Sequence, residues 1–394
     1  MKRKRETLRL MKEECRRIVK SPFIGIVCIT FLCFNIFLIY NYAGEEEKQE
    51  EFRRMHDVVL IYDAASGDEM PGEIPSRNMK DGQEEMFIQA YSDYVDTYGS
   101  MYDKLDMMSV LRQKKKQTGY EATGAYGDFI ENNYKKLQMR VEEIKRTGEG
   151  EADFYPGLFY EVFGMLYGSI GKKLLLEMVV LMLLCVLMLM DYERVHKTRD
   201  VVLTTKTGKK VMKIKAAAGI ICGLLYSMIL MAGTNLYFFS NVPLKRLWQV
   251  PVSSAVMAEK RNMMLYPFIT FWKITFGQYF VLTIIVLLVV ALLAGILGAG
   301  LQMILQNSYF AFLAMCLIYM GCYLLAFCNN GTVLDLIGIL LNPASLWITC
   351  GAWFMENDLT LSFAGNEFWC IGGSGLIAVL VVWLGKIRYK RLEV

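Results

Sequence analysis

The chain has 394 residues, of which 54% are hydrophobic and 21% charged, with a net charge of +4. Its mean hydropathy is positive, and this apolar content is too high for an ordinary soluble protein. The charged residues must therefore be segregated from the apolar ones. A membrane protein is indicated, and nucleic-acid binding is not, because the basic residues lie beside the apolar segments.

Six apolar segments are long enough to cross a bilayer core, which takes about 20 helical residues. We expect an all-α fold with six transmembrane helices, at 22–42, 171–191, 216–239, 273–298, 309–327 and 368–386. One more apolar run, within 328–367, contains Asp335 and the helix-breaking pair Asn342-Pro343. Because broken backbone survives at membrane depth only where protein or water satisfies it, this run predicts a re-entrant or interfacial hairpin.

Positive charge predicts the orientation, because Lys and Arg accumulate on the cytoplasmic side of membrane segments. Residues 1–21 carry nine Lys/Arg against three acids, and 191–215 carry eight against three. Residues 44–170 instead carry 26 acids against 15 bases. We therefore expect a multi-pass protein of the cell membrane, of bacterial plasma-membrane type, with both termini cytoplasmic.

The connecting segments follow from this topology. On the cytoplasmic side we expect a loop at 192–215, a turn at 299–308 and a tail at 387–394. On the external side we expect a large insertion at 43–170 and a loop at 240–272.

The external insertion is predicted to be mostly helical. Apolar residues recur at helical spacing over 83–116 and over 126–146, whereas DVVLIYDA at 57–64 is typical of a short strand. The insertion has no cysteine, so it is not a disulfide-stapled domain. Elsewhere the sequence leaves open a disulfide between Cys350 and Cys370.

The first 21 residues predict an amphipathic helix along the cytoplasmic membrane surface. Leu8 and Met11 fall at helical spacing among charged residues that include Glu14. An ordinary basic tail next to the membrane is the competing interpretation.

No catalytic or metal-binding motif occurs in the chain. His56 and His196 have no companion ligands at metal spacing, and a phosphate-cradling G-x-x-x-x-G-K-[ST] is absent. We expect a chain that is not an enzyme and binds no metal or cofactor. If the protein uses ATP and Mg, a partner chain must bind them.

Polar groups within the apolar segments are candidates for a translocation path. Glu177 lies near the start of the second predicted span, and an ion pair with Lys173, four residues earlier, is the competing interpretation. Asn35 is a candidate interhelical hydrogen-bond donor in the first span, and Asp335 and Asn342 lie in the predicted hairpin.

The segment after the second span resembles that of the permease subunits of ABC-2 type transporters. In that family an acidic element precedes an apolar element with threonine, a small basic turn and a lysine before the next helix. The matching positions here are Asp191 and Glu193, Val202-Leu203-Thr204-Thr205, Gly208-Lys209-Lys210, and Lys213 or Lys215. Glu193 is followed by RVHKTRD, without the glycine of the family's E-x-x-x-G-T.

The resemblance implies a dimeric ABC exporter in which 192–215 forms a coupling helix docked on a cytoplasmic ATPase. It implies two ATPase subunits, which would bind ATP and Mg, and a second permease copy or close paralogue in a lipid membrane. The implied coupling residues are Glu193, Val202, Leu203, Thr204, Gly208, Lys209 and Lys210. A loop that only sets topology is the competing interpretation.

The acidic, tyrosine-rich insertion suits a cationic amphipathic peptide by its charge sign. The expected function is therefore export of a peptide or amphipathic compound, as in antimicrobial peptide export or self-immunity. The alternative from another class is a membrane-anchored peptide sensor or immunity protein that uses the external helices without transport.

Overall fold

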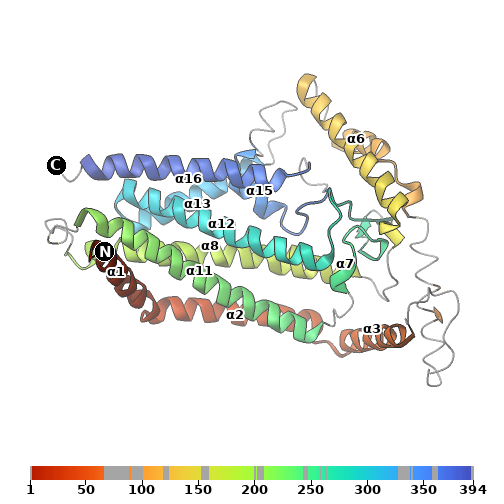
Figure 1. Cartoon of the computed structure of the whole chain (residues 1–394), viewed down its shortest axis with the longest axis horizontal. Helices are drawn as coiled ribbons and strands as arrows, with labels where there is room; N and C mark the ends of the chain where they lie inside the picture. Colours follow the sequence, from red (N-terminus) through yellow and green to blue (C-terminus); the bar gives the residue numbers. More distant parts are fainter. Residues whose placement is uncertain are drawn as a thin grey trace.

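A computed structural model shows a bundle of long helices with both chain termini at one end (Figure 1). We call this the termini end, and the opposite end, which carries the insertion between the first two spans, the insertion end. The structure describes residues 2–65, 88–89, 92, 101–118, 124–151, 159–198, 201, 208–242, 247–257, 259–261, 264–326, 338, 340–356 and 363–391. Val202, Leu203, Thr204 and Asp335 lie outside these residues.

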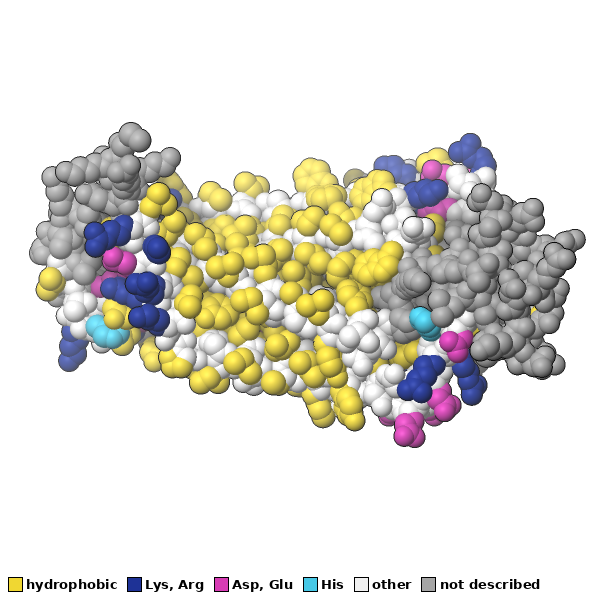
Figure 2. Space-filling model, turned by 60° about the horizontal axis from the view of Figure 1, so that its bottom comes forward, with side chains coloured by type: hydrophobic (Ala, Val, Ile, Leu, Met, Phe, Trp, Pro, Cys, Tyr) yellow, Lys and Arg dark blue, Asp and Glu magenta, His cyan; other side chains and the backbone are white. Residues whose placement is uncertain are grey.

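Six helical segments are long and apolar enough to cross a membrane, so the chain is a multi-pass membrane protein. In chain order they are Pro22–Ala43, Glu161–Met190, Val211–Asn241, Phe276–Leu305, Ser308–Leu325 and Asn366–Tyr389. They lie within α2 (Pro22–Ala43), α7 (Phe159–Phe163) with a π-helical turn (Gly164–Ile170) and α8 (Gly171–Met190), α11 (Gly208–Asn241), α12 (Phe276–Leu305), α13 (Ser308–Leu325) and α16 (Asn366–Arg391). The six predicted crossings are confirmed, and Figure 2 shows the apolar surface of one face between two charged ends.

The remaining elements are short or lie at the two ends of the bundle. The helices are α1 (Lys2–Val19), α3 (Glu46–Ala65), α5 (Met107–Thr118), α6 (Gly124–Thr147), α9 (Tyr192–Val195) and α15 (Pro343–Ile348). The 3-10 turns are Tyr102–Lys104, Glu149–Glu151, Leu247–Gln249 and Ala255–Met257. An antiparallel hairpin pairs β1 (Glu259–Arg261) with β2 (Met264–Tyr266).

The predicted strand at 57–64 is wrong, because these residues continue helix α3. Its β-branched residues favour a strand locally, but the preceding charged run favours a helix. Phe52, Met55 and Val58 then bury one helical face, and this packing overrides local propensity.

The predicted helix over 83–116 is not continuous, because the structure shows a break within its described part, residues 101–116. A 3-10 turn ends at Leu105, which is extended, and the Asp106 carboxylate accepts a hydrogen bond from the Met108 amide at 2.9 Å, which starts α5. The second predicted helix, 126–146, is confirmed as α6.

The fourth span is longer than predicted, so little of the turn 299–308 remains. Helix α12 runs to Leu305, and Gln306 adopts a left-handed conformation with φ of 59°. The side chain of Asn307 then caps α13 by accepting from the Tyr309 amide at 3.0 Å.

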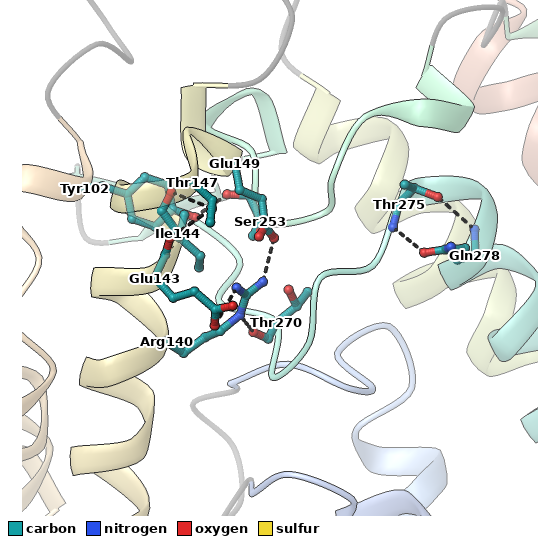
Figure 3. Close-up of polar contacts among 10 residues, drawn as sticks. All are labelled: Tyr102, Arg140, Glu143, Ile144, Thr147, Glu149, Ser253, Thr270, Thr275 and Gln278. Carbon is teal, nitrogen blue, oxygen red and sulfur yellow. Dashed lines mark hydrogen bonds and ion pairs between the residues drawn. The ribbon is translucent and has the colours of Figure 1, made fainter.

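A buried ion pair fastens the insertion to the loop between the third and fourth spans (Figure 3). Arg140 on α6 pairs with Glu149 at 2.6 Å and donates to the Thr270 carbonyl at 3.1 Å. The hydroxyl of Ser253 donates to Glu149, and that of Tyr102 donates to the Ser253 carbonyl. These groups are buried and hydrogen-bonded to one another, so they hold the insertion as part of the insertion end, and one oxygen of Glu149 is left without a partner among the described residues.

The same loop pairs with the loop before the last span. Thr270 and Met355 form an antiparallel bridge, and the Glu356 amide donates to the Ile269 carbonyl at 2.9 Å. The Phe354 amide in turn donates to the buried Glu367 carboxylate at the start of α16, at 2.7 Å. The three segments at the insertion end are therefore linked by hydrogen bonds.

Glycines allow the membrane helices to approach closely. A Cβ atom built on Gly300 of α12 would lie 2.9 Å from the Val382 amide nitrogen of α16, and one on Gly385 would lie 2.8 Å from the Gly300 carbonyl oxygen. No side chain separates the two backbones at this crossing.

We expect Gly300→Val to destabilise the protein, because overpacking would force α12 and α16 apart at a cost of about 1–3 kcal/mol. The matched control is Gly321→Val in α13, where an added Cβ meets no atom within 4 Å. The measurement is the melting temperature of each purified variant in detergent. Equal melting temperatures for the two variants would contradict this packing.

Candidate functional site

The segment that follows α8 joins several helices at the termini end. Helix α8 ends at Met190, and the four-residue helix α9 then carries Asp191 at its cap and Glu193 in its first turn. Lys197, with φ of 56°, ends the turn. This short helix directs the two acids toward different neighbouring helices. We call α9, together with the residues that contact it, the junction.

Asp191 ties the end of α8 to the turn between α12 and α13. Its buried carboxylate accepts two hydrogen bonds from Arg194, at 2.7 and 2.6 Å, and one from the Ser308 hydroxyl at 2.7 Å. The Gln302 amide adds a contact at 3.2 Å. Burial by itself would raise the pKa of Asp191, but the hydrogen bonds from Arg194 and Ser308 outweigh it and hold the pKa below its usual value.

Glu193 faces inward and ties α9 to α11 and α1. It forms an ion pair with Lys215, whose side chain is fully buried. The Lys215 ammonium also donates to the Leu189 carbonyl at 3.2 Å and lies 3.9 Å from the Glu14 carboxylate. Removing one partner of such a buried pair costs about 3–5 kcal/mol, because a charge is left buried and unpaired.

The ring of Tyr192 holds α1 against this ion pair. The Arg17 guanidinium lies 4.7 Å from the ring centroid and the Lys215 ammonium 5.1 Å from it. Arg17 also pairs with Glu14 at 2.9 Å, and the His196 ring stacks on Tyr192 with a centroid distance of 4.0 Å. The junction therefore contacts α1, α11, α12 and α13 together.

Two apolar side chains near the junction remain exposed. Val195 is 63% exposed and Val201 is 69% exposed, on either side of residues 199–200, which the structure does not describe. Neither valine belongs to the predicted coupling set, and we call the two together the exposed rim. Of the predicted coupling residues, Glu193 faces inward to Lys215, Gly208, Lys209 and Lys210 form the first turn of α11, and Val202, Leu203 and Thr204 lie outside the described residues.

The first 21 residues contain a helix, α1, and part of its apolar face packs on protein. Leu8 is exposed, Met11 packs against the bundle core and Glu14 is buried. The sequence signal for Glu14 was its position: it lies on the same helical face as Met11 and Ile18, where an acid implies a buried cationic partner. Lys215 is that partner.

Asn35 and Glu177, predicted as path residues, meet inside the membrane-spanning region. The Asn35 amide donates to the Glu177 carboxylate at 2.7 Å and contacts the Thr234 hydroxyl at 3.3 Å. The predicted ion pair between Lys173 and Glu177 is wrong, because Lys173 donates to the Ser169 hydroxyl at 2.9 Å. Its flexible chain carries the ammonium toward the insertion end, away from the apolar region.

Asn342 has a different role from Asn35 and Glu177. Its side chain caps α15 by accepting from the Ala344 amide at 2.9 Å, and it donates to the Cys322 carbonyl of α13 at 2.7 Å. Cys350 and Cys370 are not joined by a disulfide, so the pairing left open by the sequence does not form. Cys370 instead lies 3.4 Å from the Ser345 hydroxyl.

An apolar groove of about 400 Å³ lies between α8, α12, α13 and α15, and no sequence pattern predicted it. Its wall residues come from helices far apart in the chain. They include Leu176, Val180, Met315, Tyr319, Pro343 and Trp347. The volume falls in the range of small-molecule binding sites.

Comparisons with protein-family models, with curated proteins and with solved structures found no match for this chain.

We expect acid to weaken the junction through Asp191. Since the pKa of Asp191 is lowered in the folded protein, its contribution is complete above the unfolded value of about 3.9 and is lost as pH falls through the folded value. Asp191→Asn should reduce the free energy of unfolding at neutral pH by about 2 kcal/mol and so lower the melting temperature. The melting temperature of this variant should also fall less steeply as the pH is lowered. The control is Asp128→Asn at an exposed position of α6, which should leave both unchanged. An equally steep acid decline in Asp191→Asn would contradict the assignment.

Proposed function

We propose that this chain is the transmembrane permease subunit of an ATP-driven exporter, and that the exposed rim beside the junction docks on a separate ATPase. One observation carries the proposal. A short segment is fixed to four membrane-proximal helices by buried polar contacts, while its own apolar side chains Val195 and Val201 are left exposed. Basic residues flank these side chains, as expected for the cytoplasmic side.

This geometry suits the transmission of force. A push on α9 would reach α12 and α13 through Asp191, and α11 and α1 through the Glu193–Lys215 pair. Buried, hydrogen-bonded charges resist sliding, because any displacement leaves one of them unsatisfied. The helices would therefore move with the docked motor rather than slip past it. ATP and Mg would be bound by that partner.

We expect the double variant Val195→Asp/Val201→Asp to lose its ATPase partner, because both changes place a charge in an apolar contact while sparing the junction. The measurement is co-purification of the tagged full-length chain with ATP-hydrolysing activity from solubilised native membranes. The matched control is Met139→Asp, an equally exposed apolar residue on α6 at the insertion end.

Loss of ATPase activity from the double variant, but not from Met139→Asp, supports the proposal. If the unmodified chain carries no ATPase at all, the peptide sensor becomes the better explanation. Glu193→Arg is a poor probe for docking, because it would disrupt the buried pair with Lys215 and the fold with it.

For the substrate we propose an amphipathic compound, such as a cationic peptide, whose apolar part occupies the groove beside α13. The groove wall is apolar, and α13 is the least enclosed span, with 11% of its most apolar stretch buried against 67% for the second span. The acidic insertion would attract the cationic head group of such a compound.

We expect Val180→Trp, which fills the groove, to weaken binding of a dansyl-labelled cationic amphipathic peptide by about tenfold, or about 1.4 kcal/mol. The matched control is Leu225→Trp on α11, an exposed apolar position outside the groove. Fluorescence titration of the purified chain measures both. Equal affinities in the two variants would place the peptide elsewhere.

A further inference from the structure

Three spans each contribute one polar side chain to a contact buried inside the bundle. Asn35 of α2, Glu177 of α8 and Thr234 of α11 are 0%, 6% and 0% exposed. Asn35 lies eight residues before the end of α2, about 12 Å below the insertion end at 1.5 Å per residue. The contact is therefore in an apolar part of the bundle.

Glu177 has no cationic partner among the described residues. Its hydrogen bond comes from the uncharged Asn35 amide, and the ammonium of Lys173 is engaged with Ser169. The titratable groups that face Glu177 are Cys28 on α2 and Lys173 on its own helix, while α11 offers the uncharged Thr234. A carboxylate with so little compensation is strongly disfavoured at this depth relative to the neutral acid.

The Asn35 side chain can serve both forms of Glu177. Its nitrogen donates to the carboxylate, while its oxygen is buried with no hydrogen-bond partner. If the amide turns by half a rotation, the oxygen takes the nitrogen's place. It can then accept from a protonated Glu177 and from the Thr234 hydroxyl at the same two distances.

Polar groups also lie along the second span between Glu177 and the insertion end. Glu177, Lys173 and Ser169 follow one another at intervals of four residues, and Lys173 donates to Ser169 at 2.9 Å. Ser169 lies in the π-helical turn Gly164–Ile170, a distortion that is frequent at functional sites. These groups form a polar column along the outer part of the second span.

We propose that Glu177 is a proton-binding site that exchanges its proton with water at the insertion end. A proton from water forms an O–H bond on the Glu177 carboxylate, its negative charge is neutralised, and the Asn35 amide turns from donor to acceptor. Release reverses these steps, and no oxidant or reductant is needed. The proposal does not depend on an ATPase partner, so it stands or falls separately from the exporter assignment.

The test uses dicyclohexylcarbodiimide, an apolar reagent that modifies protonated carboxyl groups, on the full-length wild-type chain in detergent. We expect an adduct on Glu177, identified by peptide mass spectrometry, whose yield falls as pH rises. The matched control within the same molecule is Glu356, which is equally buried but is ion-paired with Lys114 and should stay unmodified. The isosteric Glu177→Gln variant should lose the adduct.

A second variant tests the role of the amide. Asn35→Leu removes the donor that stabilises the carboxylate, so the adduct should persist to higher pH than in the wild type. Absence of an adduct at acidic, neutral and alkaline pH would show a permanently charged Glu177 and overturn the proposal. A yield that does not change with pH, or an unchanged profile in Asn35→Leu, would also overturn it.

Discussion

A lysine ammonium with no exposed surface lies where four parts of the chain meet at the termini end. Lys215 contacts Glu193 after the second span, Glu14 of α1, the last turn of α8 and the ring of Tyr192. A charge so deeply buried is stable only while its acids stay in place. The order of the whole end therefore depends on this one set of contacts, since the same short helix α9 also positions Asp191 against the turn before α13.

Buried ion pairs join segments of the chain at both ends of the molecule. At the termini end an inward-facing Glu–Lys pair joins helices, and at the insertion end the Arg140–Glu149 pair joins a helix to a loop. Between them, spans pack through glycines and apolar side chains, with the Asn35–Glu177 contact as a polar exception. At each end, buried ion pairs and hydrogen bonds thus tie together segments that are distant in the sequence.

The six spans were predictable because a run of about 20 apolar residues matches the length that a helix needs to cross a bilayer. Helix α6 was predictable for a similar reason, since its apolar residues keep one period for over 20 residues. The strand at 57–64 failed because propensity is local, whereas Phe52, Met55 and Val58 bury a helical face together. The apolar groove could not be predicted, because its wall comes from helices separated by more than 100 residues.

Candidate site residues were found by type but not by role. Glu177 and Asn35 were recognised as unusual in apolar segments, yet only the fold shows that they touch. Glu193 was recognised as part of an acidic element and assigned to a partner surface, whereas it faces Lys215. A sequence pattern gives spacing along one chain, and it carries no information on which side of a short helix faces its own protein.

The crossing of α12 and α16 constrains how the bundle can rearrange. At Gly300 and Gly385 the two backbones approach directly, with the Val381 and Met303 side chains packed beside them, which leaves little room for one helix to rotate against the other. Those two helices form a single stiff column. Helix α13, by contrast, is the span least covered by the rest of the described chain, and hydrogen bonds anchor it near both ends, from the Ser308 hydroxyl to Asp191 and from the Asn342 amide to the Cys322 carbonyl.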